Sequence, residues 1–415
     1  MAHSANPRTF LSAFKETLAG HFAGVGGIIA GLIIAWQLGV FRSVPGHAWI
    51  IAVYPTVLTA KAVINGMFSG RLNTALYVGT VSPRFSGNMK TLSRMFQRIL
   101  TLTLATSLVM SIVSTILGTL FWGVTPASFS DILIVVVATM GLGLTLYLFT
   151  ISVTFTVFKK GLDLDSVAYP ISATIADVFI TVCYALAVNL FFNFGYGGQY
   201  TLLLIAMLPA VLLLYSLPRI IREEGFSKTM KTSLSALMFV AVIASFTGTI
   251  LQKINVVTNP WNGNPAVYPT SLFTAYPALI ELVGDAALVI GSTATTRLVL
   301  GLMEPYFSAM KNHALQILGA WAASAVAFIP LSALSLLLTG TFGLPAFSLL
   351  TSVLLATNAF ALIAMTLISY AFAILTFQKG LDPDHLVIPI ESALAGALTS
   401  TALLAALFLL LHSGG

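Results

Sequence analysis

The sequence predicts an all-α polytopic membrane protein, in which one linking transmembrane helix joins two parallel five-helix repeats. Of its 415 residues, 58% are hydrophobic and only 8% are charged, whereas soluble domains carry about 25% charged residues. Apolar runs of about 20 residues, long enough to cross a bilayer, recur along the whole chain. Two stretches of the first half also resemble two stretches of the second half, which indicates an internal duplication.

The apolar runs place the spans one by one. We expect about eleven of them. The second and eighth are rich in Gly, Thr and Ser, a composition compatible with broken or strongly tilted helices. The spans are expected near residues 19–41, 49–78, 97–123, 131–157, 166–195, 200–218, 232–252, 270–300, 313–339, 345–376 and 386–411.

The basic residues predict the orientation of these spans. If the N-terminus is cytoplasmic, the outer loops hold only Arg42 and Lys253, and nearly all other basic residues outside spans face the cytoplasm. This asymmetry is the positive-inside pattern of multi-pass proteins, here expected in the cell membrane. The net charge of +6 then reflects loops that face an anionic leaflet rather than nucleic-acid binding.

The duplication predicts how the two halves are related. Residues 158–177 resemble residues 377–396, and residues 54–79 resemble residues 276–301. Each repeat has an odd number of spans, so the extra span near 200–218 makes the two repeats parallel. One chain with two fused repeats could work as a monomer. We expect a first repeat at 1–198, a linking helix and cytoplasmic loop at 199–230, and a second repeat at 231–415.

Asp177 is the acidic residue expected deepest in the membrane. It lies roughly 18 Å further along a helix than Asp165, near the midplane of the bilayer. Carboxylates are expensive in lipid and usually mark an ion path, so we expect a cation site that lines a pore. The alternative is a structural ion pair with Lys61 or Arg71.

Three more acidic residues fall within predicted spans. Glu281 and Asp285 are four residues apart and share one helix face, and Glu391 follows Pro389 closely. We expect all three to handle ions. The alternative is a set of buried pairs with the basic residues that lie within spans, among them Arg297.

Two pairs of aspartates occupy matching positions just before spans, namely Asp163 with Asp165 and Asp382 with Asp384. An aspartate there can cap a helix by accepting hydrogen bonds from free backbone N–H groups. Paired carboxylates can also attract divalent cations, which would make a cytoplasmic vestibule. Both roles can hold at once.

These motifs resemble the MgtE-type magnesium transporter family. The first motif is Gly161, Asp163, Asp165, Pro170 and Asp177, and its second copy is Gly380, Asp382, Asp384 and Pro389. A further motif is Pro277 with Gly284-Asp285, and the segment 61–79 resembles the two-repeat solute-carrier branch, which lacks cytoplasmic regulatory domains.

The resemblance implies a five-helix transport unit whose fifth helix lines a magnesium path, with the family's pore aspartate at Asp177. The chain departs from the pattern at Gly396, where the second repeat lacks the aspartate, and at Ala62-Val63. The resemblance therefore favours ligands shared unequally, with Asp177 from one half and Glu281 or Asp285 from the other.

The leading hypothesis is a transporter of divalent cations, above all Mg²⁺, along a path between the two repeats that carboxylates line. Mg²⁺ prefers oxygen ligands. The histidines are scattered and Cys183 is the single cysteine, which argues weakly against a site for softer transition metals. The alternatives are a proton- or sodium-coupled transporter of a small organic substrate, and a membrane scaffold. No nucleophile–base arrangement, phosphate loop or cofactor motif is present, so we expect neither an enzyme nor a cofactor.

Overall fold

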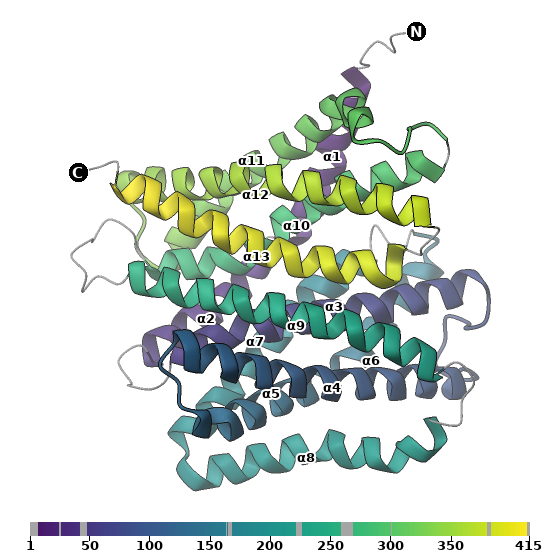
Figure 1. Cartoon of the computed structure of the whole chain (residues 1–415), viewed down its shortest axis with the longest axis vertical. Helices are drawn as coiled ribbons and strands as arrows, with labels where there is room; N and C mark the ends of the chain where they lie inside the picture. The colour runs from purple at the N-terminus through teal and green to yellow at the C-terminus, as the bar shows by residue number, and fades with distance from the viewer. Residues whose placement is uncertain are drawn as a thin grey trace. The chain divides into compact units, whose positions relative to one another are not determined.

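The computed structural model shows an all-helical chain (Figure 1). It describes residues 7–24, 26–41, 48–162, 164, 168–220, 226–258, 269–299, 301–379 and 383–412. No strand occurs within these ranges, which confirms the predicted fold class. Ten helical segments of the described chain are long and apolar enough to cross a membrane. The chain is therefore a multi-pass membrane protein.

The helices follow the apolar runs closely. Their bounds are α1 (Pro7–Gly24), α2 (Gly27–Phe41), α3 (Ala48–Tyr77), α4 (Met89–Phe121), α5 (Phe129–Gly143), α6 (Leu146–Lys159), α7 (Tyr169–Asn193), α8 (Gly195–Ile220), α9 (Phe226–Val257), α10 (Pro269–Val299), α11 (Ala314–Leu338), α12 (Leu344–Lys379) and α13 (Pro383–His412).

The bounds of the first predicted span, 19–41, are wrong. The structure has two helices there, because α1 ends at Gly24 and α2 begins at Gly27. Glycines weaken a helix and favour such a break. The apolar part of α2 covers only Gly27–Gln37, which is shorter than the roughly 20 residues that a full span needs.

The second and eighth predicted spans are continuous helices rather than broken ones. α3 runs through Pro55 and α10 through Pro277 without interruption. A proline within a helix removes one backbone hydrogen bond, and membrane helices tolerate that loss where neighbouring groups satisfy the freed carbonyl.

The helices form two compact units that interleave along the sequence. Unit 1 comprises Met1–Trp36, Lys253–Pro383 and Glu391–Gly415, and unit 2 comprises Gln37–Gln252 and Asp384–Ile390. α1 packs on α10 and α11 in unit 1, whereas nearly all of α9 belongs to unit 2. The helix that opens each sequence repeat is thus packed with helices of the other repeat.

The segment exchanged into unit 1, Met1–Trp36, also includes most of α2, and glycines let α2 and α9 approach the helices of their units closely. A methyl group on Gly31 of α2 would lie 1.8 Å from the Thr274 carbonyl oxygen of α10, and one on Gly248 of α9 would lie 1.7 Å from that of Ala52 in α3. Such backbone contact excludes any side chain at either glycine. Thr274 and Ala52 are equivalent when Tyr276 is aligned with Tyr54, so both units receive their exchanged helix in the same way.

In unit 2, α3 is the central helix and α8 is peripheral. Of the apolar window of α3, 83% is buried, against 22% for α8. The predicted linking helix is therefore a peripheral helix that packs on α4, α5 and α7. Aromatic rings join the central helix to α7, where the Tyr54 and Tyr184 ring centroids lie 5.8 Å apart.

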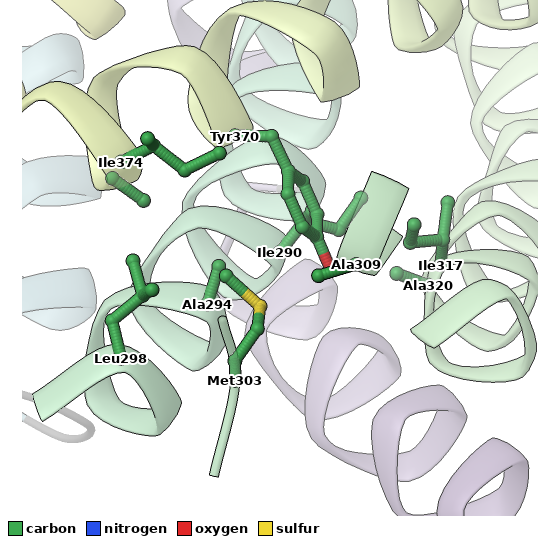
Figure 2. Close-up of a cluster of buried hydrophobic side chains, with 10 residues drawn as sticks. Ile290, Ala294, Leu298, Met303, Ala309, Ile317, Ala320, Tyr370 and Ile374 are labelled. Carbon is green, nitrogen blue, oxygen red and sulfur yellow. The ribbon is translucent and has the colours of Figure 1, made fainter. Parts of the chain in front are cut away.

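In unit 1, α10 packs against α11 and α12. Figure 2 shows the apolar cluster at this junction, in which the ring of Tyr370 from α12 lies among side chains of α10. Its members are Ile290, Ala294, Leu298, Met303, Ala309, Ile317, Ala320, Tyr370, Ala373 and Ile374. In lipid such packing stabilises through close van der Waals contact rather than through exclusion of water.

Candidate functional site

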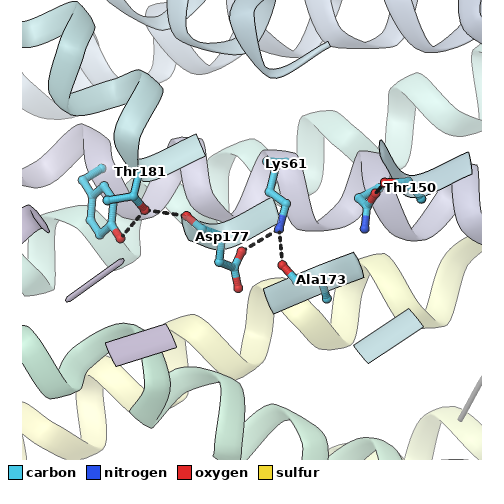
Figure 3. A network of polar contacts seen from close by, with 7 residues as sticks. Lys61, Thr150, Ala173, Asp177 and Thr181 are labelled. Atoms are coloured by element: carbon cyan, nitrogen blue, oxygen red, sulfur yellow. Dashed lines mark hydrogen bonds and ion pairs between the residues drawn. The ribbon is translucent and has the colours of Figure 1, made fainter. Parts of the chain in front are cut away.

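The most sharply defined polar contact in unit 2 joins α3 to α7. Lys61 Nζ lies 2.6 Å from Asp177 Oδ1 and donates a second hydrogen bond, 3.1 Å long, to the Ala173 carbonyl oxygen (Figure 3). The Lys61 side chain is 4% exposed and that of Asp177 is 15% exposed. Two opposite charges are thus held together within a pair of transmembrane helices.

Helix periodicity explains this geometry. Ala173 and Asp177 are four residues apart, so the carbonyl and the carboxylate present themselves on one face of α7. Lys61 reaches both from the middle of α3, and its ammonium lies between them in Figure 3. The ion pair that the sequence offered as the alternative for Asp177 is therefore present. The cation site at Asp177 stays a prediction.

A hydroxyl chain fixes α7 against α3 one turn beyond the ion pair. Thr181 Oγ1 donates to the Asp177 backbone carbonyl over 2.7 Å, and the Tyr54 hydroxyl lies 3.0 Å from the same Oγ1. Because the threonine proton is used on the carbonyl, Tyr54 must donate. This chain holds the backbone that carries the Asp177 side chain.

The same chain recurs in unit 1. Tyr276 OH lies 2.7 Å from Ser400 Oγ, which donates to the Gly396 carbonyl oxygen over 2.7 Å. Tyr276 matches Tyr54 and Ser400 matches Thr181 in the internal alignment. Aligned positions of the two predicted repeats therefore make the same type of contact, between α3 and α7 and between α10 and α13.

Glu281 and Asp285 lie on α10 beside α1. His21 Nε2 is 2.9 Å from Ser324 Oγ, and its Nδ1 is 3.9 Å from Asp285 Oδ2. A methyl group on Gly27 would lie 3.0 Å from Glu281 Oε2. The glycine break between α1 and α2 thus leaves room for these carboxylates.

His21 and Ser324 were not found by sequence reasoning, because the residues they contact are far away along the chain. His21 is buried, at 1% exposure. The pairing of a histidine near the N-terminus with an aspartate of the second repeat depends on the exchange of α1 into unit 1. No periodicity or motif signals that exchange.

Glu391 lies in α13 and is buried. A methyl group on Gly291 of α10 would come within 3.4 Å of its Oε1 and within 3.2 Å of Ser369 Cβ on α12. The carboxylate therefore occupies a place where three helices meet. Arg297, one of the basic residues proposed as a partner for the acids, instead contacts His313 through Nη1.

The paired aspartates cannot be placed in the same way. Asp163, Asp165 and Asp382 lie outside the described residues, and Asp384 lies near the start of α13 with its side chain outside the description. Among the side chains that the structure describes, no three His, Cys, Asp or Glu residues gather as a metal-binding group. Asp177 belongs to unit 2, whereas Glu281, Asp285 and Glu391 belong to unit 1.

Residues 54–187 match the MgtE family model, described as a divalent cation transporter. This part of the chain is similar to that family. The matched segment runs from Tyr54 in α3 into α7 and includes both Lys61 and Asp177. No curated protein and no solved structure matches the chain.

Proposed function

We propose that this protein transports Mg²⁺ across the cell membrane and that Asp177 binds the ion in the transport path. The observation that supports the proposal is a carboxylate on α7 within the matched domain, facing α3 at transmembrane depth. The match of residues 54–187 to a divalent cation transporter family supports the transport of a divalent cation. The choice of Mg²⁺ and of Asp177 is ours.

The donors around Asp177 suit a hard cation. Asp177 offers a carboxylate, Ala173 a backbone carbonyl, and the ammonium of Lys61 already lies within reach of both. Mg²⁺ takes oxygen ligands and is usually bound through one or two carboxylates while it keeps several waters. Asp177 and a carbonyl could therefore hold a partly hydrated ion.

The other acidic residues that the sequence singles out are secondary positions on the same ion path. We propose that Glu281, Asp285 and Glu391 in unit 1 bind or guide the same ion, and that Asp163, Asp165, Asp382 and Asp384 attract it on the cytoplasmic side. The proposal keeps a cytoplasmic N-terminus, two parallel repeats and a single chain as the working unit, for which the fused repeats give the reason.

The first experiment measures Mg²⁺ entry into proteoliposomes with a trapped Mg²⁺-sensitive dye. Wild type is compared with Asp177→Asn and with Asp131→Asn, a matched aspartate in the first turn of α5 of the same unit. We expect flux in wild type and Asp131→Asn and at least a tenfold loss in Asp177→Asn. Full flux in Asp177→Asn would remove Asp177 from the path.

A second comparison separates loss of the site from loss of the fold. Asp177→Asn leaves the Lys61 ammonium buried without its carboxylate, which destabilises a protein in its own right. Lys61→Met with Asp177→Asn removes both charges together and should fold, yet carry no Mg²⁺. If liposomes move no divalent cation but a proton or sodium gradient drives uptake of an organic solute, the alternative function replaces this one.

A further inference from the structure

The Lys61 ammonium is bound by the same kinds of oxygen atom that bind a metal cation. Its two acceptors are a carboxylate oxygen at 2.6 Å and a backbone carbonyl oxygen at 3.1 Å. These are the oxygen types that protein sites offer to hard metal ions. A lysine is also costly inside a membrane, so its presence there calls for a function or a compensating partner.

The second repeat shows that the fold does not need this pair. In the internal alignment Lys61 matches Val283 and Asp177 matches Gly396, so both charges are absent together. The neighbouring contact is nevertheless kept, since Tyr276 and Ser400 repeat the bond between Tyr54 and Thr181. The same helix pairing thus forms with the charges and without them.

We propose that Lys61 is a tethered competitor that occupies the cation position at Asp177 and must leave when a divalent ion binds. The proposal rests on the proposed function, because it assigns a role to the same site. A lysine is suited to this role, since its ammonium is a compact point charge on a flexible four-carbon chain. An arginine at this position would bind the carboxylate in a more rigid, two-pronged manner.

The exchange has a definite consequence for affinity. The divalent ion binds only that fraction of molecules in which Lys61 has moved away, so the apparent affinity is lowered by that fraction. The ammonium also neutralises Asp177 whenever the ion is absent, so an empty site does not leave a bare carboxylate in the membrane. Lys61 would therefore keep the ion loosely held and easily released.

The test measures Mn²⁺ binding to the full-length protein in detergent, with free Mn²⁺ read from its EPR signal. We expect Lys61→Met to bind Mn²⁺ at least about tenfold more tightly than wild type does. Lys61→Arg should show no such increase in affinity. Adding Asp177→Asn to Lys61→Met should abolish the gain. Lys90→Met, at an exposed position in the first turn of α4, is the matched control and should equal wild type.

A second measurement uses the wild-type protein, in case Lys61→Met fails to fold. The rate at which an amine-specific reagent modifies Lys61, followed by mass spectrometry, should rise at least threefold when Mg²⁺ is added, because the ammonium loses its carboxylate. An unchanged rate, or a folded Lys61→Met that binds Mn²⁺ no more tightly than wild type, overturns the proposal.

The failure of this proposal and that of the proposed function look different. If Asp177→Asn abolishes Mg²⁺ flux but Lys61→Met shows no tighter binding, Lys61 is a structural partner only and the transport function stands. If wild-type liposomes carry no divalent cation and no variant binds Mn²⁺, the function itself fails, and the competitor role fails with it.

Discussion

The Lys61–Asp177 ion pair predicts a large coupling in a double-mutant cycle. The two charged atoms are 2.6 Å apart and the side chains are 4% and 15% exposed. At that distance Coulomb's law gives about 6 kcal/mol with an effective dielectric constant of about 20. Desolvation of the two charges offsets part of this, and breaking a buried pair by removing one partner typically costs about 3–5 kcal/mol.

The cycle consists of wild type, Lys61→Met, Asp177→Asn and the double variant. We expect each single variant to lose about 3–5 kcal/mol of unfolding free energy, because each leaves one buried charge unpaired. The double variant should lose less than about 1 kcal/mol, because it leaves none. The coupling energy, which is the loss in the double variant minus the losses in both single variants, then has a magnitude of at least about 5 kcal/mol, well above the error of such cycles.

These free energies are measured by unfolding the protein in mixed micelles with a rising fraction of SDS. The loss of the helical circular dichroism signal reports the unfolded fraction. Asp131→Asn serves as the control for the loss of a carboxylate elsewhere in unit 2. Single variants that unfold at the same SDS fraction as wild type would show that water reaches the pair. A double variant as unstable as the sum of the single variants would show that the two charges do not interact.

Three further predictions concern contacts between helices. Tyr276→Phe removes the hydrogen bond to Ser400 and should cost about 1 kcal/mol of unfolding free energy, measured by the same SDS titration. Gly248→Ala places a methyl group 1.7 Å from the Ala52 carbonyl oxygen and should lower the thermal midpoint in detergent strongly, with a cost above about 2 kcal/mol. His21→Ala should cost about 1–3 kcal/mol, because it leaves a buried hydroxyl without its partner.

Matched controls accompany these variants. Gly70→Ala, in the C-terminal third of α3, adds a methyl group where nothing lies within 4 Å, so it should be neutral or slightly stabilising. Equal effects of Gly70→Ala and Gly248→Ala would contradict the close backbone contact. Ser324→Ala should reproduce most of the loss seen in His21→Ala, and a stable Ser324→Ala would show that their 2.9 Å contact contributes little.

The spans could be predicted because they depend on local composition. A run of about 20 apolar residues has few alternatives to a membrane helix. The internal repeat stays a prediction, based on matched residues such as Tyr54 and Tyr276. The break near Gly27 could not be predicted, because α2 continues the apolar run. The predicted first span begins at residue 19, after most of α1, because Arg8 and Lys15 lower the hydropathy of that helix.

The candidate site could be predicted only in part. Asp177 stands out as a carboxylate at membrane depth, but its partner is set by how α3 is rotated against α7. Lys61 and Arg71 both lie on α3 and are ten residues apart. They therefore differ in height along the helix and in direction around its axis. Only the packed structure distinguishes them. His21 and Asp285 meet for a similar reason, since their contact depends on which unit receives α1.

The exchange of opening helices has a consequence for biosynthesis. Unit 2 contains most of α9 and residues 384–390 as well as the residues that match the MgtE family, and unit 1 contains α1 from the start of the chain. Neither unit can be complete when only the first half of the chain has been synthesised. α1 and most of α2 must therefore wait until α10 and α11 have been made, and a chain cut between α8 and α9 should yield two fragments that are stable only when they are made together.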